Sequence, residues 1–432
     1  MSDSPHPQLK RELGVWHASA LGLGSIVGTG VFVSIGIAAG VAGPAVVLGL
    51  VLASSVALCN GLSSAQLAAS HPVSGGTYEY GYRYLSPLFG FIAGWLFLLA
   101  KSASAATAAL GFAGYLLNAF EIQGGPLHIP IALGVVLVVT VLVLVGIRRS
   151  AQVNVGIVSL TIFALLVFVV GGFRTAVAEA ATNLTPFFAP EEGETALTAV
   201  LHASALMFVA YTGYGRIATL GEEVRDPKKT IPRAVILTLL IALLLYVSVA
   251  FVGVGSVGSA ALADVTGDKA APLEVAARSF SPHVAKIISI GAVTAMLGVL
   301  LNLILGLSRV LLAMGRRGDM PGAAARLSVD GTTPYVSVVV IGMLISVLVL
   351  TGDVRTTWSF SAFTVLIYYA ITNLAAIKMP SEVRMYPIWI PVTGLIACLG
   401  LAFWVDRRIL FFGLALIAAG IVWHLVALRI RR

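Results

Sequence analysis

Four glycines lie close together in the first long apolar segment of the chain, where backbone atoms could bind a ligand. Gly22, Gly24, Gly28 and Gly30 each lower the helix propensity of the segment by about 1 kcal/mol relative to alanine. Unwinding here would expose N–H groups at the start of a second half-helix, whose positive dipole end favours a carboxylate. Close packing of small residues, for which Gly24 and Gly28 have the spacing, explains the glycines equally well.

A second group of glycines lies in the sixth apolar segment, where Gly213 and Gly215 are followed by Arg216. A charged side chain at membrane depth needs water or a partner. The two glycine groups open two successive blocks of five apolar segments. Interrupted helices at corresponding places in two halves are typical of transporters with inverted repeats. Hydropathy and the positions of the breaks therefore predict a substrate site between the two breaks, although the halves share no convincing sequence identity.

Four sequence blocks resemble the amino acid, polyamine and organocation transporter superfamily, and they follow its order and spacing. They are GSIVGTGVF at 24–32, PVSGGTYEY at 72–80, FVAYTGYGRIATLGEEVRDPKKTIPRA at 208–234 and LSRVLLAMGRRGDMP at 307–321. The resemblance implies an all-α polytopic membrane protein with twelve transmembrane helices, arranged as a leucine-transporter-type 5+5 inverted repeat plus two C-terminal helices. It also implies a secondary active transporter that moves amino acids by alternating access.

The same resemblance implies roles for residues of the first break. Backbone N–H groups of this stretch would receive the substrate carboxylate, and the Thr29 side chain could contribute. The residues concerned are Ile26, Val27, Gly28, Thr29 and Gly30. The implied role agrees with the expected dipole of an unwound helix.

For the sixth segment, the resemblance implies an aromatic gate at Phe208 and a pocket formed partly by Ala210 and Tyr211. Carbonyl groups of the unwound stretch around Gly213 would hold the amino group. Phe208 and Tyr211 could instead be ordinary packing or lipid-facing aromatic residues.

Two positions depart from the pattern of the family. Many relatives have an acidic residue where this chain has Gly215, which is followed by Arg216, so a role of that carboxylate in coupling or in cation recognition is not carried over. Some relatives have a lysine in place of a sodium ion where this chain has Thr161. Three modes therefore stay open: a hydroxyl-lined sodium site, proton coupling elsewhere, or exchange and facilitated movement without an ion. No cofactor is expected beyond a possible coupling H⁺ or Na⁺.

Lys101 lies about midway along the third apolar segment. A charge at mid-bilayer costs at least about 2.5–3.5 kcal/mol, so Lys101 should face water, a counter-ion or the bundle interior. We expect a role in coupling, either as a group that gains and loses a proton or as a fixed cation that replaces a metal ion. A structural lysine that snorkels or pairs with a carbonyl group is the alternative.

Charged residues of both signs follow the sixth apolar segment between Gly221 and Lys229. Ion pairs of this stretch could lock the inner gate, and Glu222 and the preceding Arg216 are candidates for coupling or gating. A solvated loop is the alternative, because exposed ion pairs contribute only about 0–1 kcal/mol. The segment from His71 to Tyr80 resembles the family's cytoplasmic segment near the same gate.

The composition sets the environment of these elements. Of 432 residues, 58% are hydrophobic and 11% charged, which is more apolar surface than a soluble domain can bury. Apolar runs recur at the roughly 20 residues needed to cross a bilayer, without the strict alternation of a membrane barrel. The twelve predicted spans are 14–38, 43–69, 86–118, 127–147, 151–173, 199–220, 231–256, 281–315, 333–351, 355–378, 387–405 and 409–430.

The predicted organisation has five parts. They are a cytoplasmic segment (1–13), the first repeat (14–173), an extracellular loop (174–198), the second repeat (199–378), and the last two helices with a short cytoplasmic C-terminus (379–432). Most loop lysines and arginines fall on the side of the termini, so both termini are expected to be cytoplasmic. The net charge of +8 then reflects an integral protein of the cell membrane and its anionic lipid, without a nucleic-acid partner. The sequence does not predict an oligomeric state.

Other functional classes fit the sequence less well. A channel or scaffold would not require two matched helix breaks, and a membrane-embedded enzyme would need a reactive constellation. The histidines lack HExxH spacing, and no G-x-S-x-G motif occurs. Among transporters, a carrier of neutral amino acids is favoured, because no carboxylate lies in the glycine-broken stretches. An exporter or exchanger, and a permease for cationic amino acids or amines, stay open as alternatives.

Overall fold

The computed structural model describes residues 13–71, 75–122, 125–146, 151–190, 193–218, 224–328 and 331–430. The regular structure of the described residues is helical, apart from an isolated parallel bridge between Leu13 and Val224. The first half contains α1 (Val15–Ile26), α2 (Ile35–Ala42), α3 (Val46–Ser70), α4 (Thr77–Tyr84), α5 (Pro87–Ala119), α6 (His128–Leu144), α7 (Ala151–Ala178) and α8 (Ala180–Asn183). The second half contains α9 (Ala196–Tyr211), α10 (Gly215–Ala218), α11 (Pro227–Val257), α12 (Ser259–Lys269), α13 (Pro272–Arg278), α14 (Pro282–Arg317), α15 (Tyr335–Val349), α16 (Val354–Lys378), α17 (Trp389–Ala402) and α18 (Arg407–Ile430).

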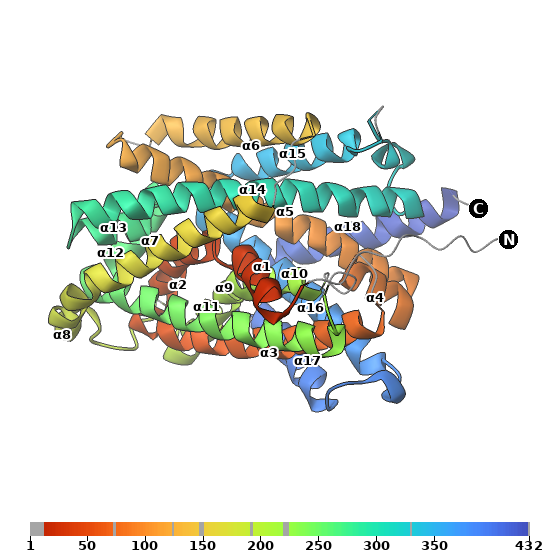
Figure 1. Ribbon diagram of the computed structural model, residues 1–432, viewed down its shortest axis with the longest axis horizontal. Helices are drawn as coiled ribbons and strands as arrows, with labels where there is room; N and C mark the ends of the chain where they lie inside the picture. The colour runs from red at the N-terminus through yellow and green to blue at the C-terminus, as the bar shows by residue number, and fades with distance from the viewer. Residues whose placement is uncertain are drawn as a thin grey trace.

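The long helices run roughly along the long axis of the molecule, as Figure 1 shows. Among the described residues, nine helical segments are long and apolar enough to cross a membrane, and one of them joins α2 and α3. The helices α15 and α17 are apolar but shorter, and α1 is half of a broken helix. An all-helical membrane architecture is therefore confirmed, whereas the count of twelve complete spans stays a prediction.

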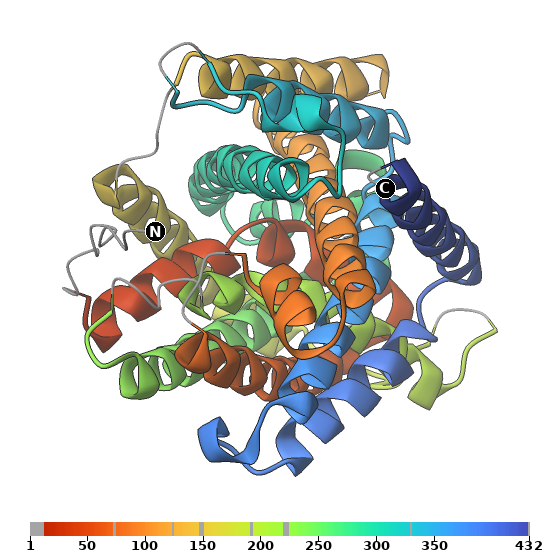
Figure 2. The same ribbon diagram turned by 90° about the vertical axis from the view of Figure 1, so that its right-hand side faces the viewer.

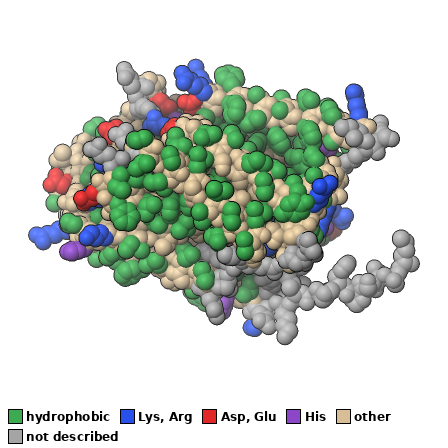
Figure 3. All heavy atoms as spheres, turned by 90° about the horizontal axis from the view of Figure 1, so that it is seen from above, with side chains coloured by type: hydrophobic (Ala, Val, Ile, Leu, Met, Phe, Trp, Pro, Cys, Tyr) green, Lys and Arg blue, Asp and Glu red, His purple; other side chains and the backbone are tan. Residues whose placement is uncertain are grey.

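The helices differ in how much lipid they would meet. In Figure 2 the bundle is viewed nearly end-on, with α5, α14 and α16 inside and with α6 and α18 at the periphery. Burial agrees with this view, because most of α16 and little of α18 is covered by other parts of the molecule. Apolar side chains cover much of the face in Figure 3, and charged side chains gather at its two ends. This distribution suits a bilayer around the middle of the molecule.

The short helices α12 and α13 close one end of the bundle over α2. Gly36 and Gly40 of α2 pack directly against Thr266 and Ala263 of α12. Tyr115 of α5 links the turn before α2 to α13. Its hydroxyl donates to the Phe32 carbonyl oxygen at 2.8 Å and accepts from the Leu273 amide at 3.3 Å. The end of the broken helix that lies near α12 is therefore firmly packed.

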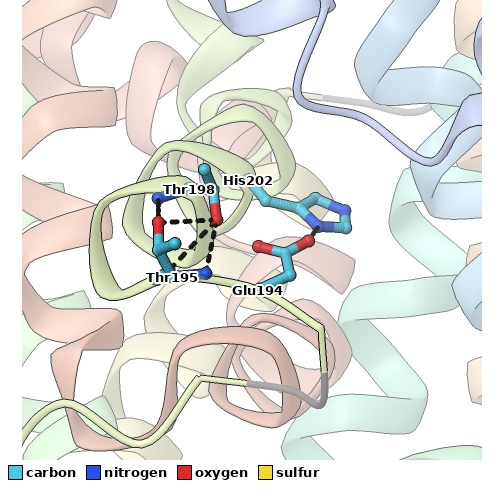
Figure 4. Close-up of polar contacts among 4 residues, drawn as sticks. All are labelled: Glu194, Thr195, Thr198 and His202. Atoms are coloured by element: carbon cyan, nitrogen blue, oxygen red, sulfur yellow. Dashed lines mark hydrogen bonds and ion pairs between the residues drawn. The ribbon is translucent and has the colours of Figure 1, made fainter.

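A capping motif fixes the start of α9, the helix that leads into the second break. The Thr195 hydroxyl accepts a hydrogen bond from the Thr198 amide, and the Thr198 hydroxyl accepts one from the Thr195 amide (Figure 4). Glu194 lies 3.2 Å from His202 one turn further along. This reciprocal cap satisfies backbone donors at the helix start and defines where α9 begins. The predicted loop 174–198 is partly helical, because α7 continues to Ala178 and α8 follows.

Candidate functional site

The first break lies between α1 and a short π-helical turn, Gly30–Ser34, that leads into α2. The last hydrogen bond of α1 runs from the Val27 amide to Leu23. The next bonds run from the Val31 and Phe32 amides to the Gly28 carbonyl oxygen, at 3.1 and 3.3 Å. The N–H groups of residues 28–30 therefore precede the second half-helix without an acceptor within that helix. They are suited to bind an anion.

The second break begins later than the sequence suggests. The helix α9 continues through Phe208 and Ala210 to Tyr211, and a 3₁₀ turn, Thr212–Tyr214, separates it from α10. Phe208 and Ala210 therefore belong to a regular helix, because the turn starts only beyond Tyr211. The end of α9 exposes carbonyl groups and the negative end of the helix dipole, which favour a cation.

The two breaks touch each other. Gly213 packs so closely on the backbone of Ser25 and Ile26 that a Cβ atom there would lie 2.6 Å from the Ile26 amide nitrogen. Gly30 packs on Ala210 in the same way, because a Cβ atom placed at Gly30 would lie 2.5 Å from the Cβ atom of Ala210. Only glycine permits approaches as close as these without movement of the backbone. The two glycine groups therefore meet at one place in the bundle.

Tyr246 of α11 joins the two breaks through its hydroxyl group. The distances from its Oη atom are 2.8 Å to the Ile26 carbonyl oxygen and 3.4 Å to that of Ala210. A second aromatic residue, Trp358 of α16, donates from Nε1 to the Leu206 carbonyl oxygen at 2.9 Å. Tyr246 thus binds carbonyl groups beside both irregular turns, whereas Trp358 binds one within α9. The sequence reasoning missed both residues.

Lys101 of α5 reaches the second break. Its ammonium group donates to Thr212 Oγ1 at 2.8 Å, and the Thr212 hydroxyl donates to the Val209 carbonyl oxygen at 2.8 Å. The Tyr369 hydroxyl donates to the Thr212 carbonyl oxygen at 3.2 Å. Lys101 thus lies inside the bundle beside the break, and its hydrogen-bond acceptor is a threonine hydroxyl.

Several predicted pocket residues are buried where the breaks meet. Phe208 and Tyr211 are fully buried, so neither faces lipid. The Phe208 ring packs edge-on against the Tyr369 ring, with 5.6 Å between the centroids. Thr29 Oγ1 and Tyr211 Oη are buried and make no hydrogen bond with any described residue. Unpaired buried hydroxyl groups are uncommon in folded proteins, and a ligand is one explanation for them.

The remaining predicted residues lie at different distances from the breaks. Thr161 of α7 is buried, and its hydroxyl donates to the Ile157 carbonyl oxygen of its own helix at 2.7 Å. Arg216 is exposed in α10. Glu222 lies outside the described residues, so its predicted gate role is a prediction still. Beyond it, Lys229 and Asp226 form an exposed local ion pair of 3.3 Å.

Comparisons with known proteins place the chain among transporters. A family model described as amino acid permease matches residues 17–428. An uncharacterized transporter of Mycobacterium tuberculosis is 38% identical over 415 residues, 96% of this chain and 90% of that protein. A branched-chain amino acid permease of Bacillus subtilis is 33% identical over 353 residues, 77% of this chain and 73% of that protein. The chain belongs to the amino acid permease family.

Membership of this family confirms the resemblance to the amino acid, polyamine and organocation superfamily. The permease is therefore an integral membrane transporter and not an enzyme. A solved manganese transporter of Eremococcus coleocola has a similar fold, with a TM-score of 0.64 over 98% of this chain and 97% of that chain. At 14% identity this likeness concerns the fold alone. In the described part of the permease, no group of three or more His, Cys, Asp or Glu side chains could hold a metal ion.

Proposed function

We propose that the permease carries a neutral amino acid across the cell membrane by alternating access, with the amino acid held where the two breaks meet. The observation that carries the proposal is the direct contact of Gly213 with the Ser25–Ile26 backbone. This contact brings the free N–H groups of residues 28–30 close to the carbonyl end of α9. A zwitterionic ligand needs such a pair of opposite dipole ends.

The carboxylate of the amino acid would bind the N–H groups of the first break, and the buried Thr29 hydroxyl would add a donor. The amino group would bind carbonyl groups at the end of α9, next to the unpaired hydroxyl of Tyr211. Phe208 would cover the side chain of the substrate. In this arrangement the N–H groups at a helix start bind the negative carboxylate, and the carbonyl groups at a helix end bind the positive amino group.

A neutral side chain is favoured because the charged group that contacts the second break, Lys101, is cationic when protonated. The Lys101 ammonium group is hydrogen-bonded at the second break, and a cationic substrate would meet it without a compensating carboxylate in either break. Unpaired charges of one sign repel strongly in a poorly hydrated site. The similarity to a branched-chain amino acid permease supports the same choice. A cationic amino acid or amine, and movement as export or exchange, are the alternatives.

Lys101 is also our candidate for coupling. Its ammonium group donates to Thr212, and Thr212 in turn holds the end of α9. Loss of the proton from Lys101 would weaken the link between α5 and the second break, so protonation could change the position of that break. A fixed cation in place of a metal ion would use the same contact. A sodium site lined by Thr161 is the competing mode, and no cofactor is proposed.

The proposed membrane arrangement follows the sequence. Both termini lie in the cytoplasm, the repeats comprise residues 14–173 and 199–378, and lysine and arginine gather on the side of the termini. The permease needs a lipid bilayer and a small-molecule substrate, and no nucleic acid takes part.

Uptake of a labelled neutral amino acid by a Gly28→Leu variant tests the proposed site. A Cβ atom at Gly28 would lie 2.6 Å from Val299 Cγ2, so a leucine must displace Val299 or the first break and would fill the space beside the break. The matched control is Gly134→Leu, because Gly134 is exposed on α6 and a Cβ atom there has no neighbour within 4 Å. We expect Gly28→Leu to lose uptake and the control to keep it at equal membrane insertion. Normal uptake by an inserted Gly28→Leu variant would reject the pocket.

A further inference from the structure

One face of α14 is exposed along the half of the helix that leads away from the breaks. Exposed or partly exposed positions recur there at intervals of three and four residues, as the positions on one face of an α-helix do. This stripe consists of Val299, Asn302, Gly306, Arg309, Ala313 and Arg316. Buried residues on other faces of the same half include Ile304, Leu307, Leu311 and Met314.

Three members of the stripe, Asn302, Arg309 and Arg316, are polar or charged. Arg309 lies about 12 Å before the end of the helix at Arg317, as the rise of 1.5 Å per residue requires. An arginine that lies within the bilayer faces the bundle interior or a water-filled cavity, and one near a helix end reaches the interface. The guanidinium groups of Arg309 and Arg316 form no hydrogen bond or ion pair with the described residues. The stripe therefore forms a water-facing wall with two cations that no described residue pairs with.

The two arginines border an open hollow of about 370 Å³. Its lining residues are Glu79, Arg309, Leu312, Ala313, Arg316 and Arg317. The Glu79 carboxylate accepts two hydrogen bonds of 2.9 Å from Arg317, so the charge of Arg317 is already balanced. Arg309 and Arg316 are left as the source of positive potential in the hollow.

The stripe connects this hollow with the first break. Its first member, Val299, is the residue that a Cβ atom at Gly28 would touch. On α1, Ser25 is exposed directly before the break, whereas all residues from Ile26 to Ala39 are buried. Exposure near the first break therefore lies on the side of the stripe and of the end of α14, whereas α12 packs over α2 on the opposite side.

We propose that Arg309 and Arg316 form a transit subsite, which binds the carboxylate of the amino acid between the paired breaks and the membrane surface at which α14 ends. This proposal rests on the proposed function, since it takes an amino acid as the substrate. The two cations are seven positions apart, about 10 Å along the helix, so a carboxylate between them stays within a Debye length of both. A cleft lined by charge of one sign concentrates the opposite charge and speeds its association.

The potential on the stripe, one turn from Arg309, can be measured without transport. A Gly306→Cys variant places a thiol on the stripe, where a Cβ atom has no neighbour within 4 Å. Modification by an anionic methanethiosulfonate reagent should be about tenfold faster than by a cationic one, because field focusing in clefts changes rates by such factors. Neutralising Arg309 and Arg316 to glutamine should bring the two rates close together. The parent protein, with its partly buried Cys59 and buried Cys398, gives the background. Equal rates before neutralisation would overturn the proposal.

Transport from each face of proteoliposomes tests the role of the subsite. Arg309→Gln and Arg316→Gln should raise the KM about three- to tenfold for substrate supplied from the face at which α14 ends, and leave the KM from the other face unchanged. Arg309→Lys should keep a KM near that of the parent, because it retains the charge. Arg326→Gln is the matched control, since Arg326 is exposed after α14 and lies off the stripe. An equal rise from both faces, or none, would overturn the proposal.

A lipid phosphate is the competing ligand of the same two cations. If the effect of Arg309→Gln occurs in vesicles with phosphatidylglycerol but vanishes in pure phosphatidylcholine, the arginines bind lipid and the transit subsite is wrong. Persistence of the effect in phosphatidylcholine supports the subsite. Failure of the proposed function itself has a different result: no amino acid would stabilise the purified permease, while the reagents would still detect the potential at Gly306→Cys.

Discussion

The substitution Gly213→Ala tests whether the two breaks form one site. In a regular helix this change should be favourable, because alanine exceeds glycine in helix propensity by about 1 kcal/mol. In the permease, the new methyl group would meet the Ser25–Ile26 backbone, with only 2.6 Å to the Ile26 amide nitrogen. Ordinary contact begins near 3.4 Å, so the breaks must separate by roughly 1 Å. We therefore expect Gly213→Ala to destabilise the permease, although the same change would stabilise a regular helix.

The cost of such overpacking is about 1–3 kcal/mol. If the whole cost falls on the bound state, substrate affinity decreases about 5- to 150-fold. The assay is thermal unfolding of the purified permease with increasing amino acid, and the control is Gly156→Ala, where a Cβ atom has no neighbour within 4 Å. We expect Gly213→Ala to be less stable and to bind more weakly than the control. Equal stability and affinity of both variants would refute the reasoning.

Three further predictions concern residues around the breaks. Lys101→Met should change the pH dependence of transport, whereas Lys286→Met, at an exposed position of α14, should leave it unchanged. An unaltered pH profile and rate for Lys101→Met would reject a role of Lys101 in coupling. Tyr246→Phe removes the hydroxyl that joins both breaks and should weaken substrate binding by about 1 kcal/mol, while Tyr335→Phe should have no effect in the same titration. Thr161→Ala should keep normal uptake with and without sodium, because the Thr161 hydroxyl is satisfied within its own helix. If the variant loses a sodium dependence that the parent shows, Thr161 is a sodium ligand.

The positions of most long helices could be predicted because hydropathy alone requires them. The third predicted span, 86–118, agrees with α5 (Pro87–Ala119), and the eighth, 281–315, agrees with α14 (Pro282–Arg317). The ninth and eleventh predicted spans, 333–351 and 387–405, agree with α15 (Tyr335–Val349) and α17 (Trp389–Ala402) to within three residues at each end. Hydropathy extends into the apolar turns that flank these helices, so it does not define where backbone hydrogen bonding ends.

The glycine groups indicated where the helices break, but not which residues unwind. The sixth-span turn starts at Thr212, after Phe208 and Ala210, because the close approach of Gly213 to Ser25 selects the position. The partners of Lys101 and Tyr246 could not be predicted, since Thr212 and Ile26 lie 111 and 220 residues away in sequence. Tyr246 belongs to an apolar run that gives no local sign of a polar role, and Trp358 lies among threonines and serines that do not single it out. A tyrosine or tryptophan in a span whose polar atom needs a partner is the signal that could have found them.

Thermal stabilisation of the purified permease across a panel of small molecules tests the central claim most directly. The panel would contain neutral amino acids, their decarboxylated amines, their methyl esters, arginine and putrescine. At about 100 times its dissociation constant, a ligand stabilises the protein by about 2.7 kcal/mol. We predict that at least one neutral amino acid stabilises the permease, and that its amine and its ester do not. Stabilisation by the amine or the ester equal to that by the amino acid would contradict a carboxylate site at the first break.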